Sequence, residues 1–60
     1  MDNTMFKGKI IKISGPVIDV RFDDGKVPPI NSLITVEGYA KHAEVALHLG
    51  NGVVRGIALD

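Results

Sequence analysis

The stretch HLGNGVVRGIALD, residues 48–60, decides the fold class because it places a turn between two apolar runs. Asn51-Gly52 is the dipeptide that a two-residue β-hairpin turn prefers, since both central residues of that turn need positive φ. Residues 53–59, VVRGIAL, are rich in β-branched and apolar side chains and are predicted to form a strand. A hairpin needs a strand on both sides of its turn, so the residues before Asn51 are expected to be extended as well.

The preceding segment, residues 39–49, fits a helix and a strand about equally well. Its Ala, Lys, Glu and Leu residues favour a helix, and Gly50 would serve as the C-cap. As a strand, it would carry Ala43, Val45, Leu47 and Leu49 on one face and His42, Glu44 and His48 on the other. The pattern alone leaves both open, and the hairpin signal at Asn51-Gly52 favours the strand.

Towards the N-terminus, short runs rich in Ile and Val alternate with breaker residues. Residues 6–13 alternate imperfectly, which predicts a bulge or coil near Ile10 and Ile11. Residues 17–22, VIDVRF, alternate cleanly, so three side chains are predicted to point inward and two outward. The inward set is Ile18, Val20 and Phe22, and the outward set is Asp19 and Arg21. Residues 33–37 form a further predicted strand.

Between these strands, Asp24-Gly25 is a strong hairpin signal, because glycine adopts positive φ without a steric clash. Residues 27–30, VPPI, contain two prolines, which remove two donors from any ladder and predict an extended connector. Breakers at intervals of about 8 to 12 residues are typical of small β proteins. The predicted fold class is all-β: a small closed or partly open β-barrel of five to six short antiparallel strands.

The glycines at 50, 52 and 56 raise the question of a phosphate-binding loop. Their spacing, G-x-G-x-x-x-G, departs from the dinucleotide fingerprint, and Val53-Val54 after them favours a strand where a helix N-terminus is needed. Neither Gly-Lys pair of the chain has the spacing of a P-loop. We therefore interpret these glycines as turn and packing residues and expect no cofactor.

Candidate metal ligands and catalytic groups are few. On one strand, His42 and His48 would lie about 20 Å apart, too far for a single ion, so these histidines and Glu44 are interpreted as a solvated face. The closest approach to a carboxylate cluster is the group Asp19, Asp23 and Asp24. The last two lie in a predicted turn, where aspartate caps backbone amides, so we expect no catalysis from this group.

Arg55 is a charge inside an apolar run, interpreted as an ordinary outward side chain, with pairing to a neighbouring subunit as the alternative. No catalytic, cofactor-binding or metal-binding residue is assigned. The residues singled out are the turn residues Asp24, Gly25, Asn51 and Gly52.

Composition narrows the function further. Lys plus Arg and Asp plus Glu each number 7 among 60 residues, and the aromatic residues are Phe6, Phe22 and Tyr39. Neutral charge and scarce aromatics speak against a nucleic-acid partner, which usually calls for a basic excess and stacking surfaces. No apolar run approaches the roughly 20 residues of a membrane span, and no signal peptide is evident, so the expected location is cytoplasmic. Residues 1–5 are expected to be a disordered lead-in to a single domain over residues 6–60.

Several short motifs recur in the order and spacing of one known family. The chain resembles the N-terminal β-barrel domain of the catalytic beta subunit of the rotary F-type ATP synthase. The resemblance covers residues 7–60 and is carried by Gly8, Ile10-Ile11, Gly15–Val20, Phe22, Pro28–Asn31, Glu44-Val45, His48–Gly50, Val53–Arg55 and Ile57–Asp60.

The resemblance implies a six-stranded barrel and a non-catalytic assembly role. In that family, barrels of alternating alpha and beta subunits join in a ring that holds the hexamer together during ATP synthesis coupled to proton transport. The nucleotide-binding and catalytic residues lie in later domains, so none is carried over to this sequence. The expected partners are neighbouring alpha subunits, and the expected location in the parent complex is peripheral at the membrane. The resemblance also implies a strand for the region matching residues 44–49.

One departure concerns the residues after Asp60, where the family has a loop and a closing strand. Without that strand the barrel has open edges, so the isolated chain is expected to form a homo-oligomer through edge pairing. Other possibilities are that the chain itself binds ATP, that it is an engineered small barrel that self-associates, or that it is a binding barrel like the OB-fold. Membership of a related rotary ATPase, vacuolar, flagellar or secretory, is a further possibility.

Overall fold

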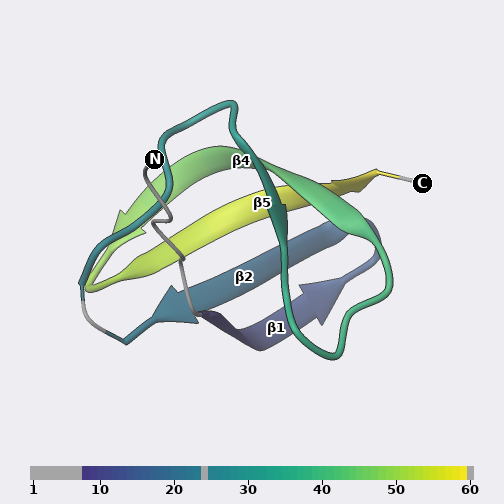
Figure 1. The fold of residues 1–60 in the computed structure, drawn as a ribbon, viewed down its shortest axis with the longest axis horizontal. Coiled ribbons are helices and arrows are strands. Elements are labelled where there is room, and N and C mark those ends of the chain that lie inside the picture. The colour runs from purple at the N-terminus through teal and green to yellow at the C-terminus, as the bar shows by residue number, and fades with distance from the viewer. Residues whose placement is uncertain (1–7, 24, 60) are drawn as a thin grey trace, which may run out of the picture.

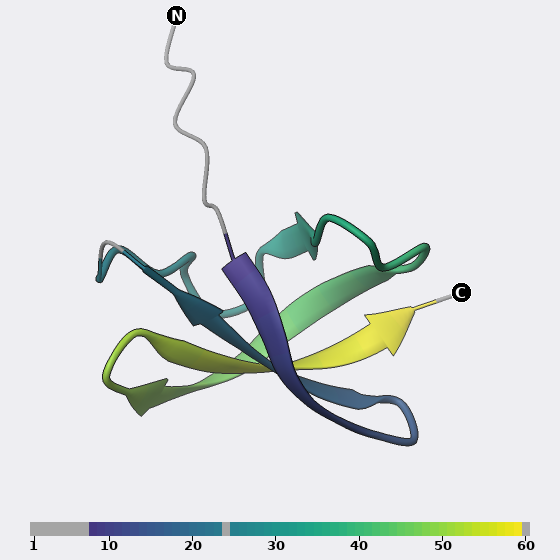
Figure 2. The ribbon, with the colours of Figure 1, turned by 90° about the horizontal axis from the view of Figure 1, so that it is seen from below.

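The computed structural model describes residues 8–23 and 25–59, which form one antiparallel sheet of five strands and no helix. The strands are β1 (Gly8–Ser14), β2 (Val17–Phe22), β3 (Leu33–Thr35), β4 (His42–Gly50) and β5 (Val53–Leu59). Their order across the sheet is β1-β2-β5-β4-β3, and the sheet curls into a half-barrel (Figures 1 and 2). The all-β prediction is confirmed, and so is the strand in the ambiguous segment. The lead-in predicted for residues 1–5 lies outside the described residues.

The turn between β4 and β5 consists of Asn51 and Gly52, whose φ angles are 56° and 77°. Two consecutive positive φ values are what a type I′ hairpin turn requires, and its twist matches that of the strands it joins. Gly52 is also held against β2, because its carbonyl accepts a hydrogen bond from the Phe22 amide at 2.7 Å. A Cβ at Gly52 would lie 2.7 Å from the Phe22 carbonyl oxygen, so a larger residue does not fit there without movement.

The chain after β2 turns but forms no hairpin: the hairpin signal of Asp24-Gly25 is misleading, whereas the predicted proline-rich crossover between the second and third strands is present. The Gly25 amide donates to the Phe22 carbonyl at 3.3 Å, whereas Asp24 lies outside the described residues. Both edges of β2 are already occupied, by β1 and β5, and the prolines that follow have no amide proton to donate to a ladder. The next segment therefore cannot return beside β2.

Residues 26–32 instead form the predicted extended connector, which crosses the concave side of the sheet to reach β4 (Figure 1, teal). The Asn31 amide donates to the Val45 carbonyl at 2.8 Å, and the Val45 amide donates to the Ser32 carbonyl at 2.9 Å. Pro28 is fully buried. The connector is thus part of the packed structure and leads directly into β3 beside β4.

Two strands contain bulges. The register of β1 shifts between Ile10 and Lys12, which confirms the irregularity predicted there. The register of β4 shifts between Val45 and Leu47, so the alternation reverses after this point and Leu47 lies opposite Arg55. The prediction that Leu47 and Leu49 share the inward face of Val45 is therefore wrong, and both leucines are exposed.

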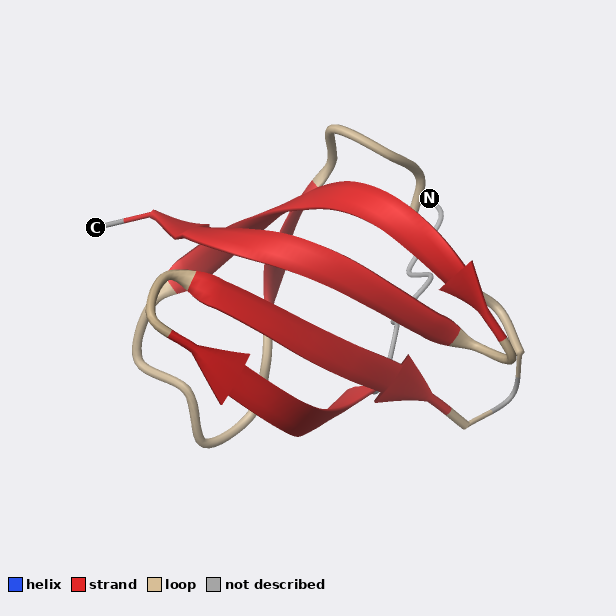
Figure 3. Cartoon of the chain, turned by 180° about the vertical axis from the view of Figure 1, so that it is seen from behind, coloured by secondary structure: helices blue, strands red, loops and turns tan. Residues whose placement is uncertain are grey.

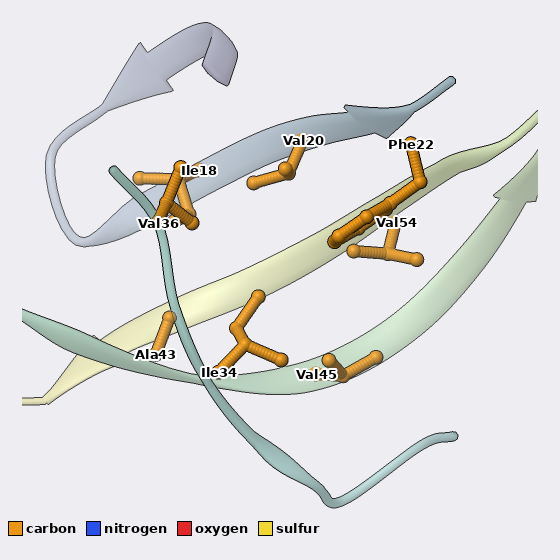
Figure 4. Close-up of a cluster of buried hydrophobic side chains, with 8 residues drawn as sticks. All are labelled: Ile18, Val20, Phe22, Ile34, Val36, Ala43, Val45 and Val54. Carbon is orange, nitrogen blue, oxygen red and sulfur yellow. The ribbon is translucent and has the colours of Figure 1, made fainter. Parts of the chain in front are cut away.

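The hydrophobic core fills the concave side of the curled sheet. Its buried members come from four strands and the segment after β3, and Figure 4 shows them together: Ile18, Val20, Phe22, Ile34, Val36, Ala43, Val45 and Val54. Ile10, Val27 and Tyr39 pack against this cluster as partly buried side chains. Gly56 lies in the same layer, and a Cβ there would come within 3.4 Å of the Ala43 Cβ.

The opposite, convex side of the sheet is called the outer face below. Figure 3 looks onto this side and shows β4, β5, β2 and β1 next to one another with no loop crossing over them. Residues that alternate with the core positions lie here, and the antiparallel registers place them in rows across the strands. The ion pair and the exposed apolar side chains described next lie on this face.

Candidate functional site

An ion pair lies at the centre of the outer face, between two strands far apart in sequence. Asp19 on β2 and Arg55 on β5 are directly opposite each other in the antiparallel register. The Arg55 Nε donates to Asp19 Oδ1 at 2.8 Å and Nη2 donates to Oδ2 at 3.0 Å, a bidentate geometry that is stronger than a single contact. Only 6% of the surface of Asp19 is exposed. Among the described residues, Asp19 is the one buried carboxylate.

The electrostatics of this pair favour its charged form. Hydrogen bonds from Arg55 hold the pKa of Asp19 below its ordinary value, and the positive charges of Arg55 and Lys12 act in the same direction against the effect of burial. The same contacts raise the pKa of Arg55. Lys12 lies opposite Asp19 on β1, so the carboxylate has a cation on each side. Both groups of the pair are therefore ionised at neutral pH.

The prediction for these two residues is corrected in one respect. Both do point away from the core, but Asp19 is buried and Arg55 forms a bidentate ion pair with it within the chain. A cleft of about 210 Å³ opens beside them, lined by Lys12, Ser14, Val17, Asp19 and Arg55. One carboxylate already neutralised by arginine supplies no free acid or base, so this cleft has no evident catalytic chemistry.

The second feature of the outer face is a group of exposed apolar side chains over β3, β4 and β5. We call it the outer patch, and its members are Leu33, Leu47, Ile57 and Leu59, with exposed fractions of 64%, 49%, 38% and 41%. The registers place all four on the outer face, because each lies opposite an outer-face residue: Leu33 and Ile57 opposite Glu44, Leu47 opposite Arg55, and Leu59 opposite His42. Glu44, half-buried, lies opposite both Leu33 and Ile57. Single exposed leucines are ordinary, but several on one sheet face are typical of a contact surface.

The histidines and Glu44 do not share one face, as the strand pattern had predicted. His42 and Glu44 lie on the outer face opposite Leu59 and Ile57, but the bulge in β4 turns His48 to the side of Val54. There the His48 Nε2 makes a 2.7 Å hydrogen bond with the Pro28 carbonyl and ties β4 to the connector. No three His, Cys, Asp or Glu side chains come together as metal ligands in the part of the chain that the structure describes.

The singled-out turn residues lie at the ends of strands, away from the ion pair. Asn51 and Gly52 lie between β4 and β5, next to Gly50, and Gly25 follows β2. Asp23 is exposed in the turn after β2, and Asp24 lies outside the described residues. The glycines at 50, 52 and 56 are in or beside the hairpin, where no helix begins. Within residues 8–23 and 25–59, no helix is long and apolar enough to cross a membrane.

Sequence comparison assigns this architecture to a family. Residues 10–60 match the family model described as the ATP synthase alpha/beta family, β-barrel domain. The chain belongs to the ATP synthase alpha/beta family. The match covers β2 to β5 and most of β1, including both members of the ion pair and the whole outer patch. The resemblance noted from the sequence is thereby confirmed at the level of the family and its barrel domain.

The matched part of this family is the barrel domain, which is non-catalytic. In this ATP synthase barrel domain the sequence patterns identified the strands but not the outer patch. Leu47 joins the outer patch only because of the β4 bulge, which no local pattern announced. The outward positions of Leu33 and Ile57 could have been predicted from the alternation of their strands.

Proposed function

We propose that this chain is the assembly domain of an ATP synthase beta subunit. Its role would be to bind the barrels of neighbouring alpha subunits in a ring that holds the alternating subunits together. The parent complex would carry out ATP synthesis coupled to proton transport. The motifs GPVIDV and HLGNGVVR favour the beta type within the alpha/beta family.

The observation that carries this proposal is a difference in exposure: the apolar side chains of the concave side are buried, whereas those of the outer patch are exposed. Leu33, Leu47, Ile57 and Leu59 come from three adjacent strands and share one face that no loop covers (Figure 3). Removing apolar surface from water contributes roughly 25 cal/mol per Å², so the burial of these side chains by a neighbour would be favourable. A structural contact accounts for them better than a ligand pocket, since the patch belongs to a convex face.

The experiment is to mix the 60-residue chain with the isolated barrel domain of an F-type alpha subunit and measure the mass of the complex by sedimentation. We expect a complex that the Leu47→Ser/Ile57→Ser variant forms at least tenfold more weakly. The matched control is Ile11→Ser, an exposed isoleucine of β1, at the other edge of the sheet from β3 and β4. Equal weakening by the control, or no complex with the alpha barrel, would contradict the proposal.

We also propose that the isolated chain associates with a second copy through the edge of β1. Among the described residues, β1 pairs with β2 alone, and Ile11 and Ile13 are exposed on it. An unpaired edge with apolar side chains is a template for strand pairing. Sedimentation of the chain at high concentration should show a dimer or larger species that Ile13→Lys dissociates, and a well-folded monomer would contradict this expectation.

The remaining expectations belong to the same proposal. The domain would lie in the cytoplasm and, within the parent complex, at the periphery of the membrane, without inserting into it. It would bind no nucleotide itself, since its only phosphate-like glycine cluster is the β4–β5 hairpin. Calorimetric titration with Mg-ATP should therefore give no heat of binding.

A further inference from the structure

Two cations lie directly opposite each other on the outer face of β1 and β2. The register pairs Lys9 with Arg21, and both side chains are exposed. Arg21 points outward because it alternates with the buried Val20 and Phe22. In an antiparallel pair, opposite Cβ atoms are about 4.5–5.5 Å apart, and like charges in that position destabilise the sheet.

The described carboxylates nearest to this pair in sequence, Asp19 and Asp23, make no ion pair with Lys9 or Arg21. A third cation, Lys12, lies on the same face of β1, opposite Asp19. The Asp19 carboxylate is already bound by two donors of Arg55. Within the described residues, Lys9, Lys12 and Arg21 make no ion pair. The chain as a whole has equal numbers of basic and acidic residues, so this excess is local to the face of β1 and β2. We call these three residues the cationic stripe.

Ordinary structural roles explain each cation singly but not their pairing. A lysine on an exposed strand face keeps its charge in water, which accounts for Lys9. Arg21 lies beside Val53 on β5, whose side chain is nearly buried, and an arginine stem often covers such a neighbour. Neither role requires a second cation directly opposite. An anionic partner that bridges both would turn this repulsion into attraction.

We propose that the cationic stripe is a docking site for an acidic segment of a protein, whose Asp or Glu carboxylates bridge Lys9 and Arg21 and reach Lys12. Charge complementarity carries the proposal, and it goes beyond the assembly role because the stripe lies on β1 and β2, away from the outer patch. A nucleic acid fits less well: of the described aromatic side chains, Phe22 is in the core and Tyr39 packs against it, so no stacking platform accompanies the cations.

The test is an NMR titration of the ¹⁵N-labelled chain with hexaglutamate, with hexaglutamine and a hexathymidylate oligonucleotide as comparison probes at the same ionic strength. We expect hexaglutamate to shift the amide signals of Lys9, Lys12 and Arg21 and to lose this effect at high salt. Hexaglutamine should shift none of them. Each of Lys9→Gln and Arg21→Gln should weaken hexaglutamate binding by up to about fivefold, the value of one exposed ion pair.

Two controls separate docking from a structural role. Lys26→Gln and Lys41→Gln remove exposed lysines elsewhere and should leave the affinity unchanged, while Arg21→Lys should restore most of it. Lys9→Gln should also raise the midpoint of thermal unfolding as it weakens binding, because it removes the repulsion. The proposal is overturned if the loop-lysine variants weaken binding as much as the stripe variants. It is equally overturned if hexaglutamate shifts no stripe signal, or if hexathymidylate binds more tightly.

Discussion

The two sides of the sheet are built from alternate residues of the same strands, yet they differ in almost every physical respect. On the concave side, Ile18, Val20, Val45 and Val54 are completely buried, and the segment that carries Ile34 and Val36 crosses over the sheet there (Figure 4). On the outer side, the centre is an ion pair, one half is cationic and the other half exposes leucine and isoleucine. The concave side therefore stabilises the fold, whereas the outer side exposes charged and apolar side chains to solvent.

The largest effect is expected from shortening a concave-side residue. Ile18→Ala should lower the free energy of unfolding by about 2–5 kcal/mol, because it removes buried methyl groups and leaves a cavity. Leu33→Ala, on the outer side, removes a similar side chain that is 64% exposed and should change that free energy by less than about 0.5 kcal/mol. Urea denaturation of both variants measures the difference, and equal losses would abolish the distinction between the two sides.

A smaller loss of unfolding free energy is expected from a change in the turn between β4 and β5. Gly52→Ala forces a side chain into a left-handed conformation and against the Phe22 carbonyl, and should cost about 1–3 kcal/mol. Gly15→Ala is the matched control, since Gly15 has a φ of 58° but no atom near its would-be Cβ. Urea denaturation should show the larger loss for Gly52→Ala, and a larger loss for Gly15→Ala would contradict the close approach seen at Phe22.

These results bear on what the sequence could predict. The strand at 17–22, the strand at 53–59 and the Asn51-Gly52 turn were predictable, because alternation and positive φ are local properties. The Asp19–Arg55 contact joins residues 36 positions apart and depends on the register of β2 with β5. The local signs of it were the outward charges within the two apolar strands, Asp19 and Arg21 on β2 and Arg55 on β5, which do not say which of them pair. The bulge before Leu47 gave no sign, since Ala46 is small enough for either face.

The ion pair is expected to affect stability mainly in acid. The folded-state pKa of Asp19 is lowered, so its stabilising contribution is present above the ordinary value of 3.8 and is lost as the pH falls from there through the lowered folded value. Asp19→Asn should therefore reduce stability at neutral pH and flatten the acid limb of the stability profile. Arg55→Lys keeps the charge but not the bidentate geometry, so its stability at neutral pH should lie between those of the unmodified chain and Asp19→Asn.

Thermal unfolding between pH 2 and 7 provides this measurement. A steep acid limb that persists unchanged in Asp19→Asn would show that other carboxylates dominate it. The outer side would then owe little of its rigidity to the central pair, and the comparison between the two sides would have to be drawn from the apolar residues alone.

The smallest effect on stability is expected at the outer patch. Leu47→Ser exposes no core and should change the free energy of unfolding by less than about 0.5 kcal/mol in urea denaturation. Val45→Ser, two residues earlier on the buried side of β4, should be strongly destabilising because it places a hydroxyl among apolar side chains. A similar loss in both variants would mean that Leu47 belongs to the core.

The account depends most on the claim that the outer side is the contact surface, and NMR mapping tests it directly. The ¹⁵N-labelled chain is titrated with the unlabelled barrel domain of an F-type alpha subunit, and the perturbed amides are placed on the structure. We predict that the largest changes fall on β3, β4 and β5 at Leu33, Leu47, Ile57 and Leu59. Changes confined to the connector at residues 26–32, or none at saturating concentration, would contradict the claim.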